Sequence, residues 1–156
     1  MDKTIVTALL LIAGVISVVV MFNAIYPAIT EGSNAMAGME RRIDERFRSQ
    51  VEIIHAVPDG VTTKTVLIWV KNVGSTSIRA LESCDVFFGP EGNFSRIPYQ
   101  SGASNWTYSV ENDSTWKPTA TIKITLTYQD FLSDGERYYI KFVLPNGVSD
   151  DYYFTE

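Results

Sequence analysis

Side chains that commonly carry out chemistry are scarce in this sequence. His55 is the only histidine and Cys84 is the only cysteine among 156 residues. A Ser-His-Asp arrangement or a histidine metal cluster therefore has little to draw on, and no Cys-x-x-Cys motif or internal disulfide is available. Asp134–Gly135 and Asp150–Asp151 are acidic turn sequences, but a calcium site needs about six oxygen ligands or more, which is more than the sequence locates. We expect no enzyme activity, no bound metal and no cofactor.

The same two residues and the overall charge have simpler interpretations. We interpret His55 as a structural residue of a strand and Cys84 as a small buried apolar residue; in an exported protein, a disulfide between chains is the alternative for Cys84. The formal net charge is −5, and the Lys and Arg residues are spread along the chain except around Arg41–Arg48. The sequence therefore has no basic patch for nucleic acid, and we expect no nucleic-acid partner.

Three Asn-x-Ser/Thr triplets indicate a different chemistry, the attachment of N-linked glycans. They begin at Asn93, Asn105 and Asn112, and none has proline at its middle position. One triplet arises often by chance, but three in such a short loop-rich region favour a glycosylated surface. Because a glycan needs a solvent-exposed site, the triplets predict that this part of the chain lies outside the cell.

An apolar segment near the N-terminus precedes the region with the glycosylation triplets. No charged residue occurs from Thr4 to Thr30. At ~1.5 Å per residue, this stretch forms a helix of about 40 Å, which is enough to cross a hydrocarbon core of ~30 Å. Large apolar residues surround the helix, so lipid or other helices must cover it. We expect the following residues to lie in a membrane or in the core of a filament: Ile5, Leu9, Ile12, Ile16, Val19 and Phe22.

A second helical stretch is expected after the apolar segment. Pro27 predicts a kink or break, because it lacks an amide donor and disfavours the helical conformation of the residue before it. Ser33 or Asn34 is expected to cap the start of the next helix. An apolar stripe at three- and four-residue spacing follows, formed by Met36, Met39, Ile43 and Phe47.

Charged residues on the other faces of this stretch indicate contact with water. Arg41/Glu45 and Asp44/Arg48 are spaced to pair along a helix. The positive-inside rule would place these arginines in the cytoplasm, but the glycosylation triplets argue for the opposite orientation. A secretory signal cleaved at Ala35–Ala37 is the competing account. The apolar run is about twice the length of a usual ~7–15-residue signal core, which disfavours cleavage.

From Gln50 onward the pattern changes to alternating apolar and polar residues, which is typical of strands. Turn signals such as Pro58–Gly60 and Pro145–Gly147 separate about seven short segments, as in an immunoglobulin-like sandwich. The predicted strands lie near residues 51–57, 66–71, 85–88, 106–110, 121–128, 137–144 and 152–154. We therefore predict an α+β chain with a helical part at residues 1–49 and an extracellular all-β sandwich at residues 50–156.

Two stretches carry a resemblance to a known family. One is Val66–Ile78, which ends in the turn Asn-Val-Gly-Ser, and the other is Gly135–Phe154 with Leu144–Asp150 at its centre. Together with the apolar helix, the charged extension and the glycosylatable sandwich, they make the chain similar to the archaellin superfamily. That family comprises the filament subunits of the archaellum, the archaeal swimming filament, and the related archaellum proteins F and G.

The resemblance implies a structural subunit of a swimming filament. The apolar helices would pack side by side in the core of a homo-oligomeric helical polymer, alone or with related subunits. The sandwiches would form an outer sheath that a membrane motor rotates. The subunit would be anchored in the membrane before assembly, would meet a membrane-embedded assembly platform and would end in an extracellular filament.

Two other roles within the same superfamily stay open. One is a membrane-anchored stator or accessory protein, like proteins F and G, which binds the surface layer or the filament through its sandwich. The other is an adhesive pilus subunit. Filament precursors carry a short basic leader, and none stands before Met1, so the chain is expected to be a mature subunit or an unprocessed anchor. Ile5 stands where bacterial type IV pilins have glutamate, which favours the archaeal branch.

Overall fold

The computed structural model describes residues 2–60 and 63–156 and begins with one long helix, α1 (Asp2–Arg48). The short 3-10 helix η1 spans Leu81–Ser83, and the described strands are β1 (Val51–Pro58), β2 (Thr65–Asn72), β3 (Asp85–Pro90), β4 (Ser95–Ile97), β5 (Asn105–Val110), β6 (Thr121–Thr127), β7 (Arg137–Val143) and β8 (Ser149–Thr155). The chain divides into two compact units, of which the first ends at Ile43 and the second spans Asp44–Glu156.

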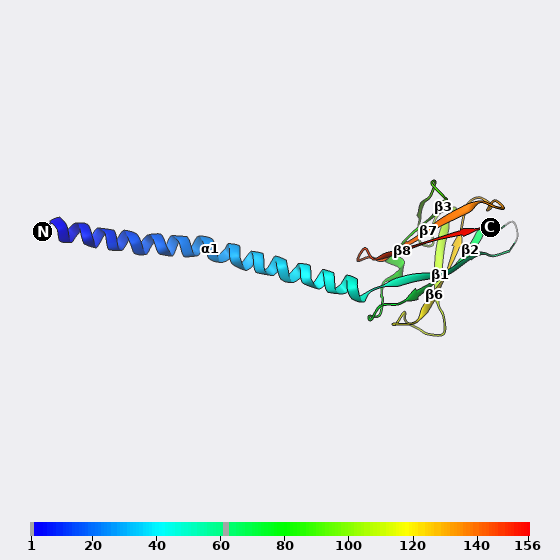
Figure 1. Ribbon diagram of the computed structural model, residues 1–156, viewed down its shortest axis with the longest axis horizontal. Coiled ribbons are helices and arrows are strands. Elements are labelled where there is room, and N and C mark those ends of the chain that lie inside the picture. Colours follow the sequence, from blue (N-terminus) through cyan, green and yellow to red (C-terminus); the bar gives the residue numbers. More distant parts are fainter. Residues whose placement is uncertain (1, 61–62) are drawn as a thin grey trace. The chain divides into compact units, whose positions relative to one another are not determined.

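The helix α1 continues through Pro27, so the predicted break and the separate second helix capped by Ser33 or Asn34 are wrong. Figure 1 shows α1 as a single coil. An interior proline removes one amide donor, so the Asn23 carbonyl loses its partner one turn before Pro27. The Thr30 hydroxyl donates to a different carbonyl, that of Tyr26, at 2.9 Å, so the helix continues without a replacement for the lost bond.

The second unit is a sandwich of two antiparallel four-stranded sheets. Their strand orders are β1-β2-β6-β5 and β4-β3-β7-β8. The alternating pattern correctly predicted the sandwich and seven of its strands, although β8 begins three residues before its predicted start. The sequence prediction missed β4, because a three-residue strand with one buried side chain, Ile97, gives no detectable alternation.

Large aromatic side chains fill the space between the sheets. Trp106 and Trp116 are fully buried, and the ring of Phe142 lies at 6.5 Å and 6.0 Å from theirs in edge-on contacts. Phe88 stacks on Tyr138 at 5.6 Å. Each buried side chain of this size contributes about 1.5–3 kcal/mol to the free energy of folding, so this core can hold the fold without disulfides.

Candidate functional site

The largest candidate surface is the apolar part of α1. The six residues predicted to lie in a filament core or membrane are 53% to 65% exposed in the isolated chain: Ile5, Leu9, Ile12, Ile16, Val19 and Phe22. No described residue of α1 is buried. By length and composition alone, this helix could cross a membrane. Each covered side chain would contribute about 1.5–3 kcal/mol, which is a strong drive toward lipid or other helices.

Two hydroxyl groups within the apolar part of α1 form hydrogen bonds to the helix itself. The hydroxyls of Thr7 and Ser17 donate to the carbonyls of Lys3 and Ala13 at 2.7 Å and 2.8 Å. Such bonds leave these hydroxyls with no need for water, which suits an environment of hydrocarbon or packed side chains. Gly14 has open space where a Cβ would stand, so a neighbouring helix could approach closely there.

The polar end of α1 agrees only in part with the predicted ion pairs. Arg48 and Asp44 form the predicted pair at 3.5 Å. The predicted pair between Arg41 and Glu45 is not among the ion pairs of the described residues. Both side chains are exposed, where solvation and side-chain entropy leave such a pair little net stability. The predicted stripe from Met36 to Phe47 is exposed.

The last turn of α1 belongs to the sandwich unit, and a loop after β2 binds it. Ser75 donates its amide, and Thr76 its hydroxyl, to the Arg48 carbonyl at 2.8 Å and 3.2 Å. The amides of Val73 and Gly74 both donate to the Gln50 carbonyl at 3.0 Å. The last carbonyl of the helix, which has no partner within the helix, is therefore capped by Ser75 and Thr76, and Val73 and Gly74 hold the residue that follows Ser49. We call this contact the junction.

Asn72 holds the junction loop in shape. It is fully buried, and its side-chain amide donates to the carbonyls of Thr76 at 2.9 Å and Trp116 at 3.2 Å. Its side-chain oxygen accepts the Gly74 amide at 3.0 Å. A buried amide with its hydrogen bonds satisfied fixes the local backbone strongly, because each lost bond would leave a polar group unpaired.

A second loop, between β7 and β8, also contacts the last turn of α1. Arg46 donates from Nε to the Asn146 carbonyl at 3.0 Å, and the Asn146 side chain donates to the Ser49 hydroxyl at 3.0 Å. The Ser49 hydroxyl in turn donates to the Glu45 carbonyl. The two stretches that carry the family resemblance thus meet at the junction.

The junction was not predicted from the sequence as a functional feature. Val66–Ile78 and Leu144–Asp150 were recognisable as motifs, but no contact of Arg46 or Ser49 with them was expected. The signal was present in the Asn-x-Gly and Asn-Gly spacings, since Asn and Gly together favour turns with local side-chain bonds. Which other segment such a turn contacts depends on tertiary structure, and a single sequence does not give that.

The predicted glycan acceptors lie at separate places on the sandwich. Asn93 is exposed in the turn between β3 and β4, and Asn112 is exposed after β5. Asn105 is half-buried at the start of β5, and its side chain donates to the Gly102 carbonyl at 3.2 Å. Asn105 and Asn112 therefore flank opposite ends of one strand. Modification at all three positions stays a prediction.

The remaining candidate residues are placed as follows. Cys84 is a free thiol, 2% exposed, as its interpretation as a small buried apolar residue predicted. Burial raises the pKa of Cys84 to about 12, with Asp85 and Glu82 adding to the effect. His55 is exposed on β1 and stacks on Trp69 at 5.8 Å. Within residues 2–60 and 63–156, no three His, Cys, Asp or Glu side chains are grouped to hold a metal.

Known proteins resemble this chain over most of its length. The family model of archaeal-type flagellin matches residues 3–154. An uncharacterised protein of Archaeoglobus fulgidus is 29% identical over 160 residues, which covers 98% of each chain.

Among solved structures, the archaellum periplasmic stator protein FlaG from Sulfolobus acidocaldarius is 32% identical with a TM-score of 0.60, over 68% of this chain and 99% of that chain. A chain of the FlaF and FlaG stator complex from the same organism is 32% identical with a TM-score of 0.61, over 68% of this chain and 89% of that chain. Archaeal flagellin FlaB1 from Methanocaldococcus jannaschii shares the fold, with 14% identity and a TM-score of 0.56 over 69% and 89%.

The matched family and the Sulfolobus acidocaldarius stator proteins are structural components of the archaellum and not enzymes. The family match spans nearly the whole chain, including the apolar helix and both junction loops. The chain therefore belongs to the archaeal-type flagellin family and is an archaellum-related structural protein.

Proposed function

We propose that this chain is a membrane-anchored stator protein of the archaellum, similar in role to FlaG. The observation that carries the proposal is the contrast in sequence identity, which is 32% to FlaG over two thirds of the chain and 14% to a flagellin over a similar share. In this role, residues 1–49 anchor the protein and residues 50–156 form its working domain outside the membrane.

The chemistry of α1 suits an anchor. Its apolar residues are exposed on every side in the isolated chain, and its hydroxyls bond within the helix. A membrane covers such a helix without any partner of matching shape, because lipid tails adapt to the side chains they surround. The stator complex from Sulfolobus acidocaldarius contains FlaF and FlaG, so we expect a related subunit as the partner of this chain.

The second candidate is the filament subunit, which the sequence analysis favoured. The match to the flagellin family model over residues 3–154 supports it. Small residues along α1 also support it, because they let helices approach closely in a bundle: Ala8, Ala13, Gly14, Ser17, Ala24 and Ala28. An adhesive pilus subunit is a further variant of this assembled form.

The location of the protein in cells separates these roles. Mass spectrometry of sheared filaments and of membranes from the same cells should find a stator chain in the membranes only. Deletion of its gene should leave filaments assembled but unable to propel the cell. Recovery of the chain as a main component of sheared filaments would overturn the stator proposal. Normal swimming with lost surface attachment would support the pilus subunit instead.

A charge placed in α1 tests the anchor directly. Ile12→Arg should reduce the membrane-bound fraction, because an arginine at the centre of a spanning helix costs about 2.5–3.5 kcal/mol. Met39→Arg is the matched control, since Met39 lies in the charged part of α1 and is 64% exposed. Equal membrane binding by the two variants would contradict an anchor formed by residues 4–30.

A further inference from the structure

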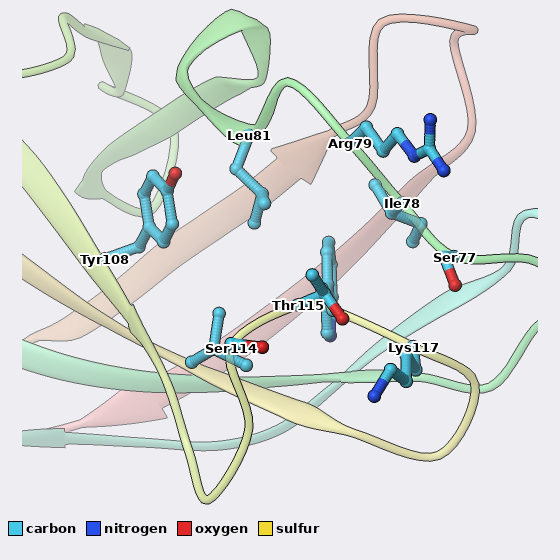
Figure 2. A pocket seen from close by; sticks show the side chains of 10 residues that line it. Ser77, Ile78, Arg79, Leu81, Tyr108, Ser114, Thr115 and Lys117 are labelled. Atoms are coloured by element: carbon cyan, nitrogen blue, oxygen red, sulfur yellow. The ribbon is translucent and has the colours of Figure 1, made fainter.

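A groove lies beside the free edge of β5, at one end of the sandwich interior. Its volume is about 360 Å³, and the segment Ser77–Leu81 forms one side while the loop Ser114–Lys117 forms the other. Figure 2 shows Leu81 and Ile78 on the side opposite Ser114, Thr115 and Lys117, while the Arg79 side chain extends away from those three residues. Tyr108 and Val110 of β5 complete the lining. Its size is within the range of ligand sites, which is about 300–1,000 Å³.

The hydrogen-bond pattern of β5 determines which of its main-chain groups face this groove. Glu111 donates its amide toward β6, to the Thr121 carbonyl, one residue beyond the paired stretch of β5 and β6. Trp106 instead donates its amide away from β6, to the Pro98 carbonyl at 3.2 Å. Directions alternate along an antiparallel strand, so Tyr108 and Val110 point their N–H and C=O groups away from β6, as Trp106 does. No residue in the described part of the chain forms hydrogen bonds with these four groups.

Among the edges of the two sheets, β5 is the least protected. The β1 edge has a bulge between Ile53 and His55, and the Ile53 amide donates to the Asp150 carboxylate at 2.7 Å. The β4 strand is only three residues long, and β8 carries two aspartates. In contrast, Asn105–Val110 contains no charge, no proline and no bulge. Soluble proteins usually protect such edges or use them to pair with another strand.

The charges around the groove favour an acidic occupant. Arg79 forms no ion pair with any described residue, while Lys117 pairs with Asp113 at 3.2 Å. Arg79 and Lys117 lie toward the same end of the groove, away from Tyr108 (Figure 2). At the Tyr108 end, burial first and the nearby Glu82 second raise the pKa of the tyrosine. The charged side chain of the groove lining that has no ion-pair partner among the described residues is therefore Arg79.

We propose that this groove binds a short extended peptide segment of a partner protein, which adds to β5 as one further strand and places an acidic side chain near Arg79 and Lys117. The main chain of the segment would bond to Tyr108 and Val110. Alternate side chains would face the apolar lining of Ile78 and Leu81, as in other complexes where a strand is added. The proposal does not depend on whether α1 anchors a stator or builds a filament.

The covered half of β5 explains why a peptide fits better than a second sandwich. Residues Pro98–Gln100 already occupy the edge at Trp106, where Gln100 donates to the Trp106 carbonyl at 3.1 Å. Only the stretch from Tyr108 to Val110 is open. A stretch this short matches a few residues of an extended segment, at ~3.3 Å per residue, but not the full edge of another sheet.

Binding of model peptides to the full chain in lipid nanodiscs tests the proposal. The probes are fluorescent synthetic peptides of alternating Thr and Val, one with a central Asp and one with a central Lys. We expect the Asp peptide to bind and to slow hydrogen exchange in the 105–112 region. Arg79→Glu should weaken its binding about tenfold, because it removes a charge-assisted contact. Arg42→Glu, the same change on exposed α1, should have no effect.

A backbone variant tests the strand pairing itself. Val110→Pro removes the amide that points into the groove and leaves the ladder with β6 intact, so binding should be lost. Val110→Thr keeps the amide and should bind as the wild type does. Equal binding of the Asp and Lys peptides, or unchanged exchange in the 105–112 region, would overturn the proposal. These two measurements decide the question even if Val110→Pro does not fold.

Discussion

Gly74→Ala should destabilise the sandwich by opening the junction. A Cβ at position 74 would overlap the Arg48 carbonyl oxygen and come within 2.6 Å of the Gln50 amide nitrogen. Both are backbone atoms, which cannot move aside as the end of a side chain can. The loop 73–76 would have to withdraw from the last turn of α1.

The size of the effect follows from the bonds that this withdrawal breaks. Residues 73–76 donate four hydrogen bonds to the carbonyls of Arg48 and Gln50. Loss of two to all of them, at about 1 kcal/mol each, lowers the free energy of unfolding by about 2–4 kcal/mol. For a unit of this size, that corresponds to a decrease of roughly 8–16 °C in melting temperature.

Thermal unfolding of the full chain in detergent measures this change. Fluorescence of the buried Trp106 and Trp116 reports on the sandwich, and circular dichroism reports on α1. Gly38→Ala is the control, because a Cβ at Gly38 meets nothing within 4 Å and alanine favours a helix. A melting temperature of Gly74→Ala within about 2 °C of the wild type would refute the close contact at the junction.

Three further predictions follow from single residues. Asn72→Ala should lower the free energy of unfolding by about 2–3 kcal/mol, measured by chemical denaturation, because it removes the donor to two carbonyls and the acceptor of the Gly74 amide. Cys84 should resist maleimide at pH 8 until the chain unfolds. Burial raises its pKa from 9.0 to about 12 in the folded chain, so its contribution to stability should be full below pH 9 and decline between pH 9 and pH 12. If the chain is glycosylated, peptide mapping should find Asn93 and Asn112 modified more fully than the half-buried Asn105, and Asn112→Gln should remove one glycan mass.

The patterns that predicted the fold act over a few neighbouring residues. Alternation along β2 and β6 put Val66, Ile68 and Val70 opposite Leu126, Ile124 and Ile122, all of which are buried. Such burial needs only a period of two, so the sequence was sufficient. The composition of Thr4–Thr30 likewise predicted a helix without a solvent face, and the structure confirms the helix.

The errors arose where local preference competes with a continuous hydrogen-bond ladder. Pro27, Gly32 and Ser33 each disfavour a helix, yet α1 passes through all three. Good helix formers lie on both sides, namely the apolar run before Pro27 and the stretch from Ala35 to Arg48, which is rich in Ala, Met, Glu and Arg, and a few weak positions do not outweigh them. The junction and the free edge of β5 were not predictable, since both depend on segments far apart in the sequence, such as Arg46 with Asn146.

The junction is equally useful to both candidate roles, so it cannot distinguish them. In both roles the chain carries an apolar helix and a sandwich. Hydrogen bonds from two loops to the last turn of α1 make that turn part of the sandwich.

The roles differ instead in what covers the apolar residues of α1. Lipid accepts any apolar surface, whereas a helix bundle needs small residues where the helices touch. Replacement of Gly14 by leucine should therefore leave a membrane anchor functional and disrupt a filament, because the added side chain would hold a neighbouring helix away.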